Sequence, residues 1–125
     1  MFKTGGRLQA GEAAEDLALR WLLRRGLTLV QRNYRVARGP GARGGEIDLI
    51  LRDAEGTLLF VEVRARATGA HGGAAASVTA RKQRSLRFAA QHFLLRYATL
   101  PACRFDVLAI DGDDVQWLQG AFDGG

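Results

Sequence analysis

The sequence predicts a single α/β domain with the element order αβββαβ, in which helices flank a mixed central sheet. Two stretches place apolar residues three and four positions apart, as amphipathic helices do, and four others have the alternation or β-rich composition of strands. The 125 residues, of which 47% are hydrophobic, suffice for one core without disulfides. We find no linker or internal repeat, so one domain over residues 1–125 is expected.

The first predicted helix covers residues 11–25 and ends at Gly26, a common helix terminator. Its apolar positions are Ala14, Leu17, Ala18, Trp21 and Leu22. Residues 27–36 are rich in β-forming side chains and predict a strand, and residues 37–45 predict a loop. This loop spells GxGxxG, but it leads into a strand instead of a helix, so a dinucleotide site is not expected there.

Residues 46–52 and 57–65 predict two strands joined by a turn, and therefore an antiparallel hairpin. After a second loop, Thr79 is a suitable N-cap for a helix over residues 80–97. The apolar stripe of that helix is Leu86, Ala89, Ala90, Phe93, Leu94 and Tyr97. The last predicted strands, which form a small terminal hairpin, cover residues 104–110 and the short segment VQWL.

Several classes of protein are excluded by composition. No run approaches the 18 apolar residues of a membrane span, and the N-terminal segment lacks the apolar stretch of a secretory signal. The single cysteine, Cys103, rules out an internal disulfide or a zinc finger, and we expect it to be a small core residue. A cytoplasmic location and no membrane partner are therefore expected.

The charge balance favours an anionic partner. The chain has 18 basic and 13 acidic residues, a net charge of +5, and 16 of the basic residues are arginine, whose planar fork grips phosphate. A GC-rich genome, which makes alanine, glycine and arginine abundant, is an alternative explanation of the same numbers that requires no function. The residues that we expect to contact nucleic acid are Arg32, Arg35, Arg43, Arg66, Arg81 and Lys82.

Asp48 and Glu62 fall inside otherwise apolar strands, where a charge is costly unless it is paired or binds a cation. Alternation places Glu46 and Asp48 on one face of the first hairpin strand, with Ile47 and Leu49 on the other. Glu62 and Arg64 likewise share a face of the second strand. This placement allows a paired-carboxylate site, and it equally allows ion pairs between the acids and arginines of the hairpin.

Parity of the hairpin register decides whether that site can form. Asp48 and Glu62 lie side by side, about 5 Å apart, only if paired positions sum to an even number. Two adjacent carboxylates repel each other, and Mg²⁺ would relieve that repulsion. The alternative is that both acids pair with Arg52, Arg64 or Arg66 across the hairpin.

The segment GGEIDLILRDAEGTLLFVEVRAR resembles the signature of the YraN-type family, an uncharacterised bacterial family that reads GEIDLI, a turn, and then FVEV followed by a basic residue. Other stretches resemble that family in the same order, including ExxAxxWL from Glu15, the segment RNYR from Arg32, RKQ from Arg81 and RFDV from Arg104. The resemblance covers nearly the whole chain.

The YraN-type family in turn resembles the PD-(D/E)xK nucleases, most closely the archaeal Holliday-junction resolvases. This resemblance implies a restriction-endonuclease-like αβββαβ core, as the periodicity predicts. It implies that Asp48, Glu62 and the main chain of Val63 bind Mg²⁺ or Mn²⁺, and that Glu15 is an additional helical acid. By the same resemblance we expect DNA, in particular branched DNA, as the partner, and a homodimer as one option.

The sequence departs from the superfamily pattern at Arg64, which stands where a lysine is usual. Arginine cannot give up its proton, although it can stabilise developing negative charge. Lys82, near the start of the second predicted helix, is another basic residue that could approach the site. We therefore expect a Mg²⁺-dependent endonuclease with Asp48, Glu62, Arg64 and Glu15 as catalytic residues. An inactive nucleic-acid-binding module and a protein-interaction adaptor are the alternatives.

Some remaining polar and aromatic residues have simpler interpretations. Glu15 would otherwise be a solvated helix flank, and Glu46 a further acid near the metal or a partner of Arg64. His71 is expected to be a surface loop residue. The two tryptophans are expected in the core, whereas Tyr34, between two arginines, is the better candidate for base stacking.

Overall fold

The computed structural model describes residues 7–40, 44–66 and 78–124 of the chain. These residues form two helices and five strands, and the predicted αβββαβ order is confirmed, with a further strand at the end. The elements are α1 (Arg7–Leu23), β1 (Thr28–Val36), β2 (Gly45–Arg52), β3 (Leu58–Arg66), α2 (Ala80–Leu94), β4 (Cys103–Asp111) and β5 (Asp114–Phe122).

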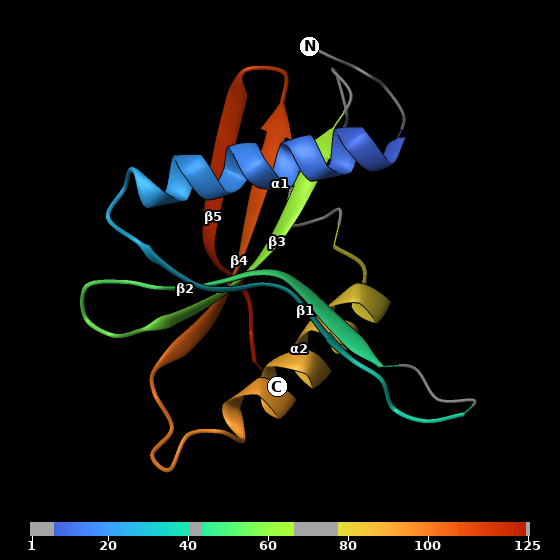
Figure 1. Ribbon diagram of the computed structural model, residues 1–125, viewed down its shortest axis with the longest axis vertical. Helices are drawn as coiled ribbons and strands as arrows, with labels where there is room; N and C mark the ends of the chain where they lie inside the picture. Colours follow the sequence, from blue (N-terminus) through green and yellow to red (C-terminus); the bar gives the residue numbers. More distant parts are fainter. Residues whose placement is uncertain (1–6, 41–43, 67–77, 125) are drawn as a thin grey trace.

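The five strands make one mixed sheet in the order β1-β2-β3-β4-β5. All neighbours run antiparallel except β3 and β4, which are parallel and have α2 between them in the chain. Figure 1 shows α1 crossing β3, β4 and β5, whereas α2 lies beside β1 and β2. The mixed sheet with flanking helices is therefore confirmed.

Each helix covers its own hydrophobic core. The α1-side core contains Ala18 and Leu22 of α1 together with Leu49, Leu51, Leu59, Val61 and Leu108 of the sheet. The α2-side core contains Leu86, Ala89 and Phe93 of α2 together with Ile47, Ile50, Phe60 and Val107. Because both faces of β2 and β3 are covered, the side chain of Glu62 in β3 is buried, and that of Asp48 in β2 is half-buried.

The helix and strand ends differ from the predictions in a few places. Thr79 caps α2 as predicted, since its side chain accepts a hydrogen bond from the main-chain N–H of Lys82. The helix ends at Leu94 instead of residue 97, and β5 is longer than the predicted VQWL because it pairs with β4 as an edge strand of the main sheet. No helix among the described residues is both long and apolar enough to cross a membrane.

The alternation of side chains in β2 breaks at Asp48. Leu49 lies in the α1-side core but Ile47 in the α2-side core, so the prediction that they share a face is wrong. The side-chain alternation of the neighbouring strand β1 changes at the same level, since Tyr34, which pairs with Ile47, also packs on the α2 side. The residue before Tyr34 is Asn33, whose φ of 51° lies in the left-handed region. Asp48 therefore sits where the two faces of the sheet exchange.

Candidate functional site

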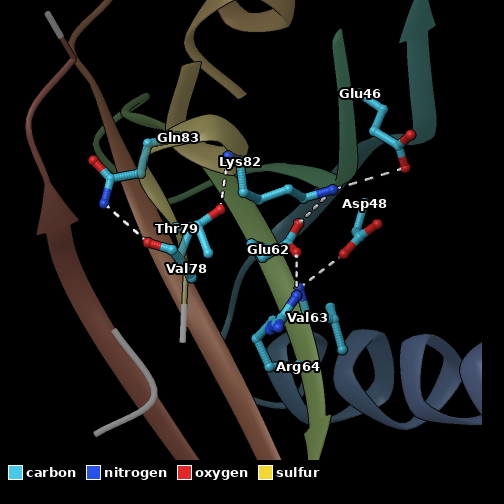
Figure 2. A network of polar contacts seen from close by, with 9 residues as sticks. All are labelled: Glu46, Asp48, Glu62, Val63, Arg64, Val78, Thr79, Lys82 and Gln83. Carbon is cyan, nitrogen blue, oxygen red and sulfur yellow. Dashed lines mark hydrogen bonds and ion pairs between the residues drawn. The ribbon is translucent and has the colours of Figure 1, made fainter. Parts of the chain in front are cut away.

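Asp48 and Glu62 come from the two strands of the predicted hairpin and lie next to each other (Figure 2). Leu49 pairs with Val61 and Ile50 with Phe60, and this register, continued by one residue, places Asp48 opposite Glu62. The required even parity is confirmed. Beyond the paired positions, Oδ2 of Asp48 accepts a hydrogen bond of 2.9 Å from the main-chain N–H of Val63.

Glu62 is the less satisfied of the two acids. Its residue is only 3% exposed, and its Oε1 is buried without a hydrogen bond. Burial, and then the Asp48 carboxylate, raise the pKa of Glu62 to about 7, against the opposing charges of Lys82 and Arg64. A buried carboxylate with a raised pKa and an oxygen that accepts no hydrogen bond has the features of a candidate functional group.

Asp106 shows how a purely structural buried acid looks in the same sheet. It is fully buried on β4 and accepts hydrogen bonds from Nε of Arg104, Nε1 of Trp117 and the main-chain N–H of Gly120. These bonds tie β4 to β5, and both of its oxygens have partners. Burial alone therefore does not mark Glu62; what distinguishes it from Asp106 is a buried oxygen that accepts no hydrogen bond.

Glu15 approaches the pair from α1. Burial, and then the Asp48 carboxylate, raise the pKa of Glu15. Its side chain also lies 3.7 Å from the guanidinium of Arg32, which Asp16 binds more closely, at 2.9 Å. No three acidic, histidine or cysteine side chains within residues 7–40, 44–66 and 78–124 are close enough together to hold a metal ion. The expected convergence of three carboxylates is therefore not found in the described part of the chain.

Two cations flank the buried carboxylate of Glu62 (Figure 2). Arg64, two residues further on β3, lies 3.3 Å from Oε2, and Lys82 of α2 lies 3.7 Å from Oε1. Lys82 also lies 4.0 Å from Oε2 of Glu46, so Glu46 is a second ion-pair partner of this lysine. The structure thus brings Lys82 to the site, which the sequence left open.

A cleft of about 900 Å³ opens beside this pair. It lies between α2 and the paired ends of β1 and β2, and both Glu46 and Arg64 line it. Gly45 permits the close packing that forms its floor, since a Cβ there would come within 2.3 Å of the Ser85 carbonyl oxygen. Six basic residues line the cleft: Arg35, Arg38, Arg64, Arg81, Lys82 and Arg84.

The predicted nucleic-acid contacts are only partly gathered there. Arg35, Arg81 and Lys82 line the cleft, whereas Arg32 is held by α1 on the other side of the sheet. Arg43 and the side chain of Arg66 lie outside the described residues. Two further basic residues of the cleft, Arg38 and Arg84, were not among the predicted contacts; Arg84 could have been included, because it follows Arg81 by three positions on the same face of α2.

Three single-residue predictions have clear outcomes. Tyr34 is buried, and its hydroxyl bonds Nδ1 of His92 at 2.7 Å, so it is a core residue and cannot stack on a base. Cys103 is exposed and not in the core, because it begins β4 at the end of the sheet. Trp21 and Trp117 meet edge to face and pack against the α1-side core, but they are partly buried instead of lying within it. His71 lies outside the described residues.

Comparison with known proteins connects this site to one family. Residues 14–110 match the family model described as uncharacterised protein family UPF0102. A UPF0102 protein of Methylibium petroleiphilum is 62% identical over 113 residues, which cover 90% of this chain and 93% of that protein. A UPF0102 protein of Paracidovorax citrulli is 60% identical over 116 residues, which cover 93% and 84% of the two chains.

Proposed function

We propose that this chain, which belongs to the uncharacterised protein family UPF0102, is a divalent-metal-dependent endonuclease that acts on DNA. The observation that carries the proposal is the buried Glu62 carboxylate, which has an oxygen without a hydrogen bond, an adjacent Asp48 and two cations that also line a basic cleft. A structural acid does not need this arrangement, as Asp106 shows. We also propose a cytoplasmic location.

The donor set fits a hard cation such as Mg²⁺ or Mn²⁺. Mg²⁺ commonly binds through one or two carboxylates, and water and substrate phosphate complete its shell. Asp48 and Glu62 would hold the ion, with the main-chain carbonyl of Val63 assisting and Glu15 ordering water from the α1 side. A cation bound there lowers the pKa of a coordinated water and polarises the phosphate ester.

The cleft supplies the second half of the proposal. Two of its six basic residues, Arg64 and Lys82, also pair with Glu62, and phosphate contacts made by such residues position a nucleic acid without reading its sequence. Arg64 both lines the cleft and touches Glu62, so it is placed to bind the phosphate that is cut. Its guanidinium keeps its proton and stabilises negative charge instead of activating water.

A non-cleaving nucleic-acid-binding module of the same fold is the second candidate. It is favoured by the absence of a third close carboxylate in the described part of the chain, and by the cations already present at both oxygens of Glu62. In that case the acid pair would serve only to orient Arg64 and Lys82 toward phosphate. The two candidates differ in metal binding and in turnover.

Labelled linear, nicked, flapped and four-way DNAs, each incubated with Mn²⁺, Mg²⁺ or EDTA, test the proposal. We expect metal-dependent cleavage of at least one DNA by the wild type, and a loss of about 100-fold or more in Asp48→Asn. Glu55→Gln, which changes an exposed turn acid, is the matched control and should cleave like the wild type. The four-way DNA tests the expected branched substrate, and sedimentation of the same samples tests the homodimer.

Calorimetry with Mn²⁺ separates the candidates. Heat of binding in the wild type that is lost in Asp48→Asn supports the metal site. An absence of both heat and cleavage, with DNA binding retained, would establish the binding module. DNA affinity that hardly changes with salt would exclude phosphate recognition and contradict both candidates.

A further inference from the structure

Lys82 reaches the buried acid from a different element than Arg64 does. Its Nζ lies 3.7 Å from Oε1 of Glu62 and 4.0 Å from Oε2 of Glu46, as Figure 2 shows. The distance to Glu62 is an ion-pair distance beyond hydrogen-bond range, and Oε1 of Glu62 accepts no hydrogen bond. Lys82 is therefore the weakly held cation at the open oxygen of Glu62.

The N-terminal cap of α2 fixes the position of the Lys82 main chain. Thr79 caps α2 and accepts a hydrogen bond of 3.1 Å from the main-chain N–H of Lys82, and the side chain of Gln83 bonds the carbonyl of Val78 at 3.1 Å. The first turn of α2 contains no acidic residue. A cation in that turn opposes the helix dipole, so helix stability does not explain why a lysine stands here.

The two cations are also differently placed for chemistry. Arg64 extends from β3 beside Glu62 and contacts Oε2, whereas Lys82 extends across from α2 and lines the same cleft. A lysine carries a compact charge on a flexible stem, and it can turn between neighbouring acceptors more easily than a planar guanidinium can. Lys82 can thus leave Glu62 for a phosphate oxygen in the cleft without moving the backbone.

We propose that Lys82 provides the catalytic ammonium group of this site from α2, in place of a lysine on β3. The inference rests on the proposed function. When Glu62 binds a cation, Lys82 gives up its ion pair and turns to the phosphate that is cut. There its charge stabilises the negative charge that builds up on the phosphate oxygens. The water oxygen bonds to phosphorus, the ester P–O bond breaks, and the leaving oxygen takes a proton that the water releases; Lys82 stays protonated throughout.

Variants at three cleft positions test this assignment by turnover. We expect Lys82→Met to lower kcat by about 100-fold or more, and Lys82→Arg, which keeps the charge, to recover part of that loss. Arg84→Met, which removes another cleft cation from the same helix, is the matched comparison and should raise KM by a larger factor than it lowers kcat. If Lys82→Met keeps wild-type kcat while Arg64→Met loses it, the ammonium assignment is wrong.

Metal affinity gives a second readout that does not depend on turnover. Removing a positive charge next to Glu62 should tighten Mn²⁺ binding in Lys82→Met by about 3- to 10-fold, and Lys82→Arg should bind Mn²⁺ like the wild type. A lysine that only supports the fold would instead weaken Mn²⁺ binding when removed, and that result overturns the inference. A wild type that neither cleaves DNA nor binds Mn²⁺ overturns the proposed function, whereas a cleaving wild type with an equally active Lys82→Met overturns the inference alone.

Discussion

The main-chain N–H of Val63 donates a 2.9 Å hydrogen bond to the side chain of Asp48, just past the last paired positions of β2 and β3. The Asp48 carboxylate takes the place of a main-chain acceptor at the point where the hydrogen-bond ladder between β2 and β3 ends. The bond holds Asp48 beside Glu62 and leaves Asp48 with both a structural and a proposed metal-binding function. The two functions can be separated by substitution.

Asparagine at position 48 should preserve the fold and remove the metal site. The amide oxygen of Asp48→Asn still accepts from the N–H of Val63, whereas Asp48→Ala leaves that donor without a partner and costs about 1–3 kcal/mol of stability. Both variants should lose the heat of Mn²⁺ binding. Urea unfolding followed by calorimetry checks this; equal stability losses in the two variants would contradict the structural function of the bond.

Stability without metal should fall as the pH rises through the titration of Glu62. The folded protein raises the pKa of Glu62 from the ordinary value of 4.5 to about 7, mainly by burial and by Asp48, so the folded state binds the proton more tightly than the unfolded chain does. The stabilisation is therefore complete below about pH 4.5 and is lost as the pH rises to about 7.

Glu62→Gln removes this pH dependence. At pH 8 without metal, we expect it to be more stable than the wild type by about 1–3 kcal/mol, because no buried charge is left uncompensated. Urea midpoints measured from pH 5 to pH 8 provide the comparison. A wild type whose stability rises over this range relative to Glu62→Gln would show that Lys82 and Arg64 already neutralise the carboxylate.

Asp106 should affect stability and not the site. Asp106→Ala leaves Arg104, Trp117 and the N–H of Gly120 without their acceptor and should cost about 3–5 kcal/mol. A smaller loss is expected for Asp106→Asn. Mn²⁺ affinity of the folded fraction should equal that of the wild type. A metal-binding defect in Asp106→Asn would mean that this acid also contributes to the site.

The salt dependence of DNA binding should identify which arginines contact phosphate. Arg81 lines the cleft, so Arg81→Met should reduce the slope of log affinity against log salt by about 1. Arg32 is bound to Asp16 on α1, so Arg32→Met should leave the slope as it is. Fluorescence anisotropy with one labelled duplex at several salt concentrations measures both. Equal slopes for the two variants would place the DNA elsewhere on the surface.

The sequence by itself determined the order of the elements and placed Asp48 and Glu62 on the two strands of one hairpin. These features are local, because alternation identifies the two strands and a short turn joins them, whereas the register that sets the two acids opposite each other came from the structure. The N-cap at Thr79 was likewise predictable, because it depends on residues within one turn. The family resemblance rested on this same hairpin.

The tertiary structure alone decided how the two faces of the sheet are used and which residues meet there. Strict alternation could not show that the chain reverses face between Ile47 and Leu49, since the reversal involves the left-handed Asn33 on the neighbouring strand. Nor could the sequence bring Lys82 to Glu62, twenty positions earlier, because that distance depends on how α2 packs on the sheet. Periodicity predicts the side that a residue faces only where the strand is regular, and only packing decides what lies on that side.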